Sequence, residues 1–236
     1  MGWRSYRNGR AAALDAAHLD APAPDGYPRG VSTSDSLVPA SAPLVLASVS
    51  PRRRELLARA GVRFEVTPSN VPEQARPGEA PAQLARRLAS EKALAVAQRL
   101  GPAPARWVLG ADTIVVIDGD VLGKPDDAEH AVALLQRLVG RRHHVLTAVA
   151  LVASDTLAER HVLVESAVTM RAADERELRA YVATGESLDK AGAYAAQGNG
   201  RLLIEKIEGS ETNVIGLPLE ETLALLRAAG IASGVA

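Results

Sequence analysis

The sequence contains no cysteine, so it can form no disulfide and offers no thiolate ligand to a metal ion. Aromatic residues are also scarce, with one Phe, two Trp and four Tyr among 236 residues, so a hydrophobic core has to be built from Ala, Val and Leu. No stretch reaches the roughly 18 consecutive apolar residues that a membrane-spanning helix needs. These absences favour a reducing compartment, and we expect a cytoplasmic protein with no membrane partner.

The chain also lacks an excess of charge of either sign. Charged residues make up 23% of it and hydrophobic residues 47%, and the formal net charge is -1. Nucleic-acid-binding proteins usually carry a clear basic excess, so no stable nucleic-acid partner is predicted. A chain of 236 residues is long enough to bury one substantial core or two smaller lobes.

Residues 1–42 differ in composition from the rest of the chain. The stretch "APAPDGYPRGVSTSDSLVPASAP" is rich in Pro, Ala, Ser and Gly and has no sustained apolar period, which predicts a flexible tail. Acidic residues and a histidine interrupt "AAALDAAHLDA" before it reaches the length of a secretory signal. We therefore expect one folded domain at residues 43–232, followed by a short tail at residues 233–236.

Within that domain, strand-like and helix-like patterns alternate, which predicts an α/β fold. Helices are expected to begin at Pro51, to span residues 81–100, 174–184 and 219–230, and to run from a capping box of Asp126 and Glu129 to about Gly140. Strands are expected at residues 44–47, 62–69, 143–152, 160–170 and 201–209, with a further hairpin within residues 107–125 around the turn "DGD".

Three consecutive arginines stand at the start of the first expected helix, in "LVLASVSPRRRELLARAG". Pro51 suits the first helical position, so the arginines fall in the first turn, where the helix dipole and free N–H groups favour acidic residues instead. Arg54 fits a solvated basic surface. For Arg52 and Arg53, the free N–H groups, the guanidinium groups and the Ser48 hydroxyl together predict a site for a phosphate or polyphosphate anion.

Two polar residues interrupt the apolar pattern further along the chain. Asp112 lies inside the buried-strand run "VLGADTIVV", where a carboxylate is costly unless a cation, a donor or a metal ion meets it. The alternative is a bend or bulge in which Asp112 accepts hydrogen bonds from nearby N–H groups. Lys124, in the turn "GKPDD", is placed to reach a phosphate, although a solvated loop lysine has the same sequence pattern.

Three separated stretches carry a resemblance: "LASVSPRRRELLARAGVRFEV", "VLGADTIVVIDGDVLGKP" and "GESLDKAGAYAAQGNGRLLIEKIEGSETNVIGLPL". Together they are similar to the Maf family of nucleoside triphosphate pyrophosphatases, over Leu44 to about Ala229. The resemblance implies a two-lobed α/β fold of the inosine-triphosphatase-like kind, with a long mixed β-sheet around a central cleft. It also implies a homodimer and metal-assisted hydrolysis of a nucleoside triphosphate to the monophosphate and pyrophosphate, a house-cleaning reaction of nucleotide pools.

Carried over residue by residue, the resemblance assigns Asp112 as the proton acceptor, and Glu73 with Asp112 as metal ligands. It assigns the phosphate site to five polar residues: Ser48, Arg52, Arg53, Lys92 and Lys124. Attack at the α-phosphorus builds negative charge on phosphoryl oxygens, which basic side chains and a metal ion stabilise. Since only hard oxygen ligands are available, Mg²⁺ is the expected ion, with Mn²⁺ as the alternative.

The sequence departs from the family pattern at two places. Asn70 and Pro72 stand where the family usually has acids, and "EGSETN" stands where an aromatic residue is common. The first departure leaves the metal environment weaker or differently arranged. The pair His143 and His144 lies on an expected strand, where neighbouring side chains face opposite ways, so a metal shared by the two is not predicted.

Three positions separate the branches of the family by substrate. The branch acting on dTTP and UTP has the residues that stand here as Arg52, Thr113 and Gln197, whereas the branch acting on 7-methyl-GTP has an aromatic residue, Gln and Glu. The Thr hydroxyl and the Gln amide are expected to pair with the ring of uracil or thymine. We therefore expect dTTP and UTP as substrates. The alternatives are a 7-methyl-GTP pyrophosphatase, a septum-formation regulatory protein and a nucleotide-binding module without turnover.

Overall fold

A computed structural model describes residues 42–231. The predicted tails, residues 1–42 and 233–236, lie outside the described residues except for Ala42. Among the described helices, none is long and apolar enough to cross a membrane.

The described chain alternates strands and helices in the order predicted by the sequence. The strands are β1 (Leu44–Leu46), β2 (Phe64–Val66), β3 (Trp107–Ile117), β4 (Asp120–Leu122), β5 (Arg142–Ala153), β6 (Glu159–Met170) and β7 (Ile204–Glu208). The helices are α1 (Pro51–Arg59), α2 (Pro81–Leu100), α3 (Ala128–Leu138), α4 (Glu175–Val182), α5 (Glu211–Ile215) and α6 (Leu219–Ala228), with short 3-10 helices η2 (Ala191–Ala193) and η3 (Gly198–Leu203).

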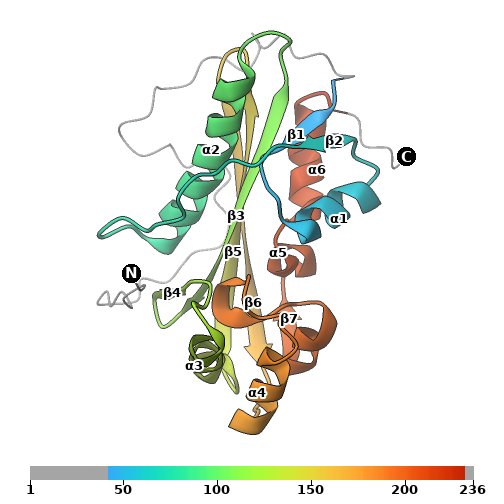
Figure 1. The fold of residues 1–236 in the computed structure, drawn as a ribbon. Helices are drawn as coiled ribbons and strands as arrows, with labels where there is room; N and C mark the ends of the chain where they lie inside the picture. The colour runs from blue at the N-terminus through green and yellow to red at the C-terminus, as the bar shows by residue number, and fades with distance from the viewer. Residues whose placement is uncertain (1–41, 232–236) are drawn as a thin grey trace.

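One mixed sheet of seven strands joins these elements, and a mixed sheet is what the family resemblance implied. Its order is β2-β1-β3-β5-β6-β7, with β4 paired to β3. The pairs β1–β2 and β1–β3 are parallel, and the other pairs are antiparallel. Strands β3, β5 and β6 have 11 or 12 residues each, and in Figure 1 they extend through both halves of the molecule. The sheet therefore connects an upper and a lower half.

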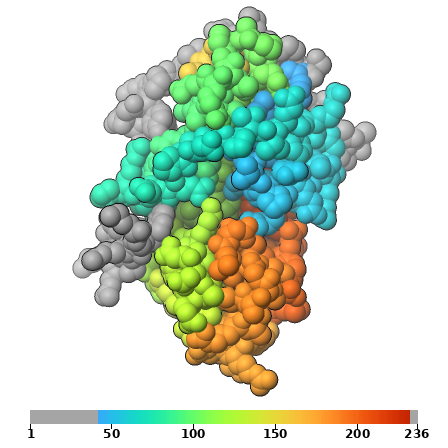
Figure 2. All heavy atoms as spheres, in the orientation of Figure 1, coloured from blue at the N-terminus to red at the C-terminus, as the bar shows by residue number. Residues whose placement is uncertain are grey.

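The hydrophobic core differs between the two halves. In the upper half, α2 packs on one face of the sheet, and α1 and α6 pack on the other (Figure 1). In the lower half, α3 and α4 pack with the distal parts of β3 and β5 in a separate core cluster. In Figure 2 the blue and teal segments of the upper half meet the lime and orange segments of the lower half across the middle of the molecule.

A glycine on β3 explains how closely α2 approaches the sheet. A Cβ atom added at Gly110 would lie 2.2 Å from the Ala89 carbonyl oxygen and 2.8 Å from the Ala93 nitrogen, both on α2. Only glycine therefore permits this contact between helix and strand. The close approach brings Lys92 of α2 next to Asp112 of β3.

Two local predictions were wrong. The N-cap of α3 is Asp127, not Asp126, and its carboxylate accepts a hydrogen bond from the His130 N–H at 2.7 Å. The extended backbone of Asp127 ends the preceding loop one residue later than the Asp126–Glu129 pattern suggested. The strand expected at residues 201–209 begins only at Ile204, because η3 precedes it. The sequence reading also missed α5 and both 3-10 helices.

Candidate active site

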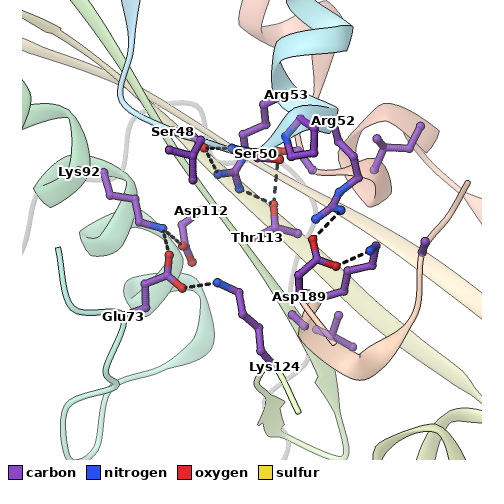
Figure 3. Close-up of a pocket in the computed structure, with 18 of the residues that line it drawn as sticks. Ser48, Ser50, Arg52, Arg53, Glu73, Lys92, Asp112, Thr113, Lys124 and Asp189 are labelled. Atoms are coloured by element: carbon purple, nitrogen blue, oxygen red, sulfur yellow. Dashed lines mark hydrogen bonds and ion pairs between the residues drawn. The ribbon is translucent and has the colours of Figure 1, made fainter. Parts of the chain in front are cut away.

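A cavity of about 440 Å³ lies between the two halves. Eight of the nine site residues named from the sequence line it: Ser48, Arg52, Arg53, Glu73, Lys92, Asp112, Thr113 and Lys124. Figure 3 shows these side chains converging on one space, from α1, α2, β3 and the loops after β1, β2 and β4. Residues far apart in the sequence thus form one site.

The first turn of α1 divides its three arginines by environment. The helix begins at Pro51, as predicted, and carries no acidic residue in its first turn. Arg53 is buried, Arg52 is half-buried and Arg54 is exposed. Arg54 therefore occupies the solvated position expected of it, whereas the other two face the cavity.

Arg53 is held by three neutral oxygen atoms. Its Nε donates to the Gly216 carbonyl at 2.8 Å, and its two terminal nitrogens donate to Ser48 Oγ at 3.1 Å and Thr113 Oγ1 at 3.2 Å (Figure 3). A guanidinium has five N–H groups, so two remain without a partner among the described residues. Burial lowers the pKa of Arg53, although Asp112 and Glu73 oppose that shift. Arg53 is thus a fixed cation with spare donors at the cavity.

The opposite side of the cavity holds two lysines and two carboxylates in one cluster. The Lys92 ammonium donates to Glu73 Oε1 at 2.5 Å and to Asp112 Oδ1 at 2.6 Å, and the Lys124 ammonium donates to Glu73 Oε2 at 2.8 Å. Asp112 stays in a regular strand, paired with Ala148 of β5, so the alternative of a bulge does not apply. A cation, Lys92, meets the buried carboxylate instead.

These contacts shift the two carboxylates in opposite directions. Burial raises the pKa of Asp112 above its ordinary value, and Lys92 and Arg53 only partly oppose this. Burial would also raise the pKa of Glu73, but the charges and hydrogen bonds of Lys92 and Lys124 outweigh it and lower that pKa to about 2. Glu73 is therefore ionised at any working pH, whereas Asp112 is the more basic carboxylate.

The loop that carries Glu73 is fastened to α2 by Arg87. The Arg87 guanidinium donates to the Gln74 carbonyl at 2.9 Å and to both oxygens of Glu79 at 2.6 and 2.7 Å. Both side chains of the Arg87–Glu79 ion pair are buried. This network anchors the residue next to Glu73, and thereby the carboxylate, over the cavity.

The described residues contain no group of three or more His, Asp or Glu side chains arranged to hold a metal ion. Two carboxylates nevertheless fit the way Mg²⁺ is usually held, by one or two carboxylates plus water and substrate phosphates. Glu73 and Asp112 both direct an oxygen at one cation, the Lys92 ammonium. The donor set therefore suits a divalent ion that is completed by substrate oxygens.

Gln197 is the one named site residue that does not line the cavity, although its neighbour Ala196 does. Gln197 precedes η3 and is half-buried.

The side chains of His143 and His144 face opposite ways, as expected of neighbouring residues on a strand. His143 is buried with Nε2 2.7 Å from the Tyr194 hydroxyl, whereas His144 pairs with Glu165 at 2.5 Å.

Several lining residues were not named from the sequence. Asp189 accepts from Arg52 at 3.3 Å across the cavity, and Lys190, Tyr194 and the Gly216 segment also line it. Asp189 and Lys190 lie in the quoted stretch "GESLDKAGAYA". A pair of opposite charges in a loop does not indicate which distant residue it will contact. Arg52 and Asp189 are 137 residues apart, so only the folded chain reveals the contact.

Comparison with known proteins gives an independent result. A family model described as "Maf-like protein" matches residues 43–229. A protein of Myxococcus xanthus (strain DK1622) named dTTP/UTP pyrophosphatase is 51% identical over 188 residues, which cover 80% of this chain and 93% of that protein. Proteins of the same name from Geobacter metallireducens and Escherichia coli O157:H7 are 47% and 51% identical, over 82% and 78% of this chain and 99% and 91% of their own lengths.

Proposed function

The chain belongs to the Maf family, and on that premise we propose that it is a nucleoside triphosphate pyrophosphatase that converts dTTP and UTP to the monophosphate and pyrophosphate. The relatives named above carry that activity in their names and align with nearly the whole described chain. In this reaction water attacks the α-phosphorus, the bond to the bridging oxygen breaks, and pyrophosphate leaves.

One observation carries the proposal: a buried arginine with two spare N–H groups faces a buried carboxylate across one cavity. The arginine side suits phosphoryl oxygens, on which negative charge grows during the attack. The carboxylate side suits a water molecule that has to be oriented and deprotonated. Asp112 has a pKa raised by burial, which makes it a better proton acceptor than an exposed aspartate.

The remaining basic residues complete the phosphate site. Arg52 and Lys124 are more exposed than Arg53, and both are paired with carboxylates that a triphosphate would replace. Ser48 lies against Arg53 and offers a hydroxyl to the same anion. The triphosphate is thus proposed to extend from Arg53 towards the cluster of lysines.

The proposed cofactor is Mg²⁺, with Mn²⁺ as the alternative, held by Glu73 and Asp112. A divalent ion held by these two carboxylates would neutralise part of the phosphate charge. The ammonium of Lys92 lies between these carboxylates, so it is free to turn to a phosphate oxygen once another cation pairs with them. On the basis of the family resemblance, we also propose that the protein is a homodimer and that it acts in the cytoplasm.

The choice of base is proposed to depend on Arg52, Thr113 and Gln197. Arg52 and Thr113 support it by lining the cavity, while Gln197 stands one residue from the lining residue Ala196. Losing one polar contact to the base costs roughly 1 to 3 kcal/mol, or about 10- to 100-fold in kcat/KM. We therefore expect dTTP and UTP to be preferred to other nucleotides by at least that margin.

The test is release of pyrophosphate from dTTP, UTP, ATP, GTP and 7-methyl-GTP with Mg²⁺, compared as kcat/KM. Preference for dTTP and UTP supports the proposal. Preference for 7-methyl-GTP or another purine overturns the base assignment and leaves a pyrophosphatase. Binding without any pyrophosphate release indicates a nucleotide-binding module, and neither binding nor release favours a regulatory protein. Repeating the assay with a chelator, then with Mn²⁺, tests the cofactor.

A further inference from the structure

The hydrogen bonds around Arg53 continue beyond the cavity into the sheet. Thr113 on β3 lies directly opposite Thr147 on β5, and their hydroxyl oxygens are 2.9 Å apart. Thr147 Oγ1 is in turn 3.0 Å from the Asn213 carbonyl oxygen. Thr147 is fully buried and does not line the cavity, so it cannot touch a substrate there.

The two ends of this chain fix the direction of every hydrogen bond in it. At one end the Arg53 guanidinium only donates, and at the other end a carbonyl oxygen only accepts. Each threonine hydroxyl has one proton, so Thr147 donates to the Asn213 carbonyl and Thr113 donates to Thr147. The Gly216 carbonyl is a poorer acceptor for Thr113, because it is 3.4 Å away and already accepts from Arg53 at 2.8 Å.

Both arms from Arg53 therefore end on the same turn of chain. One arm runs directly from Nε to the Gly216 carbonyl, and the other runs through two hydroxyls to the Asn213 carbonyl. The Asn213 carbonyl also accepts from the Gly216 N–H at 3.0 Å, which closes the loop. Two anchors at different nitrogens restrict rotation of the guanidinium plane, and so determine where its two spare N–H groups point.

The accepting turn is itself firmly placed. The Asn213 side chain is fully buried, and its amide donates to the Val145 carbonyl at 3.0 Å and to Ser166 Oγ at 2.9 Å. The Asn213 N–H donates to Ser210 Oγ at 3.2 Å. The two side-chain contacts fasten α5 to β5 and β6, so the carbonyl that ends the relay lies on a helix that is held against the central sheet.

From this geometry we propose that Thr147 is a positioning residue for Arg53, acting through a one-way hydroxyl relay from Thr113 to the Asn213 carbonyl. The proposal rests on the pyrophosphatase function proposed above. It also changes the expected role of Thr113, because its proton is used on Thr147 and one of its lone pairs accepts from Arg53. Thr113 can then accept from a ring N–H of a base but cannot donate to a ring carbonyl.

The test replaces Thr147 by Val, which keeps the shape and removes the relay, and by Ser, which keeps the hydroxyl. Thr169→Val, a half-buried change on β6 away from the cavity, is the matched control. We expect Thr147→Val to raise KM for dTTP by about 10-fold while kcat changes by less than about threefold, because one charged hydrogen-bonding group becomes less well placed. Thr147→Ser is expected to restore KM to within about twofold, as it retains the donor.

Two further readouts separate this role from a structural one. Because the relay acts on a phosphate-binding group, binding of GTP should weaken along with that of dTTP and UTP. A loss confined to dTTP and UTP overturns the proposal, because it would place the effect at the contact of Thr113 with the base. An unchanged KM in Thr147→Val, or no rescue by Ser, also overturns it. If Val does not fold, Thr147→Cys takes its place; it lacks the methyl group and replaces the hydroxyl by a weakly donating thiol.

Calorimetric titration with inorganic pyrophosphate keeps this test independent of catalysis. Weaker binding by Thr147→Val and normal binding by Thr147→Ser support the relay even if the wild-type protein hydrolyses no nucleotide, which would overturn the proposed function alone. Equal binding by all three proteins overturns the relay whether or not the enzyme is active.

Discussion

The two sides of the cavity hold their cations in different ways. Arg53 is fixed by a carbonyl and two hydroxyl oxygens, all neutral. Lys92, across the cavity, is fixed by the carboxylates of Glu73 and Asp112, and Lys124 by Glu73 alone. Both sides carry basic side chains, yet among those named for the phosphate site only Arg53 has no carboxylate bonded to it.

This difference suggests a division of labour between the two sides. A buried cation whose direct hydrogen-bond acceptors are all neutral has its desolvation offset only by more distant charges, so it attracts an anion strongly. A cation paired with carboxylates attracts an anion only after those carboxylates find another cation. We infer that Arg53 is the permanent anchor for phosphate and that the lysine cluster becomes available when a metal ion binds Glu73 and Asp112.

The largest effect is expected from removing the carboxylate that faces Arg53. Asp112→Asn keeps the shape of the side chain but cannot accept a proton, so turnover of dTTP should fall about 10²- to 10⁴-fold. Far-UV circular dichroism and pyrophosphate release at saturating dTTP measure fold and activity together. Asp118→Asn, in an exposed turn whose positive φ suits Asn, is the control. Near-normal turnover by folded Asp112→Asn contradicts the assigned role.

The sequence predicted both sides of this comparison, but not how each is held. Asp112 and the arginines could be identified because each is unusual for its local structure: an acid in an apolar strand and bases at a helix start. Their hydrogen-bond partners have no such local pattern. The Arg53–Gly216 contact joins residues 163 apart, and it depends on how α5 packs on the sheet.

The fold shows the same limit. Periodicity located the long strands and α2, whose predicted range of residues 81–100 is confirmed. It missed α5, which has only five residues, and placed the cap of α3 one residue early, because short segments adopt their backbone from tertiary contacts. At the site, Gln197 likewise could not be placed from a local pattern. It was named from the family resemblance, and its contact with a base stays a prediction.

The second prediction concerns the pH dependence of protein stability, to which the buried His143 contributes and the site residue Glu73 contributes little. Burial, with a smaller effect of His144, lowers the pKa of His143 from 6.5 to about 4. The folded protein then binds fewer protons than the unfolded chain, so stability is complete above pH 6.5 and is lost as the pH falls towards 4. The shift corresponds to about 3 kcal/mol of unfolding free energy.

Denaturant unfolding of the wild type and His143→Gln at pH 7 and pH 4 measures this difference. Gln does not titrate and can still bond the Tyr194 hydroxyl, so its stability should fall less with acid, by about 3 kcal/mol. Glu73 contributes little between pH 6.5 and 4.5, since its stabilising effect is lost only as the pH falls from its ordinary pKa of 4.5 towards about 2, and that loss is common to both proteins. His161→Gln is the control for removing an imidazole. Parallel acid profiles of wild type and His143→Gln contradict the prediction.

The third prediction replaces the anchor by a cation of the other kind. Arg53→Lys keeps the charge but cannot reach Gly216, Ser48 and Thr113 at once, because an ammonium is a point charge and not a planar fork. We expect kcat/KM for dTTP to fall about 10- to 100-fold, mainly through KM. Arg54→Lys, at the exposed neighbouring position, should be neutral. If Arg53→Lys is equally neutral, the charge alone is sufficient and the comparison between the two sides fails.

The smallest effect is expected at Arg52, which lies beside Arg53 but is held as the lysines are. Its guanidinium pairs with Asp189 at 3.3 Å, and the Asp189 side chain is 60% exposed, so the pair contributes at most about 1 kcal/mol to stability. Asp189→Asn removes a negative charge from the cavity rim and frees Arg52 for phosphate. KM for dTTP should therefore fall about two- to fivefold at low salt, with Tm almost unchanged.

Salt provides the check on that last prediction. Exposed charges are screened within about 3 Å at 1 M ionic strength, so the lower KM of Asp189→Asn should return to the wild-type value there. The higher KM of Arg53→Lys should persist, because position 53 is buried and less screened. The measurement is KM for dTTP at about 0.05 M and 1 M potassium chloride for wild type and both variants. A higher KM in Asp189→Asn at low salt would mean that Asp189 orients Arg52 for binding. Arg52 would then belong with Arg53 as a fixed anchor, and the division between the two kinds of cation would have to be drawn elsewhere.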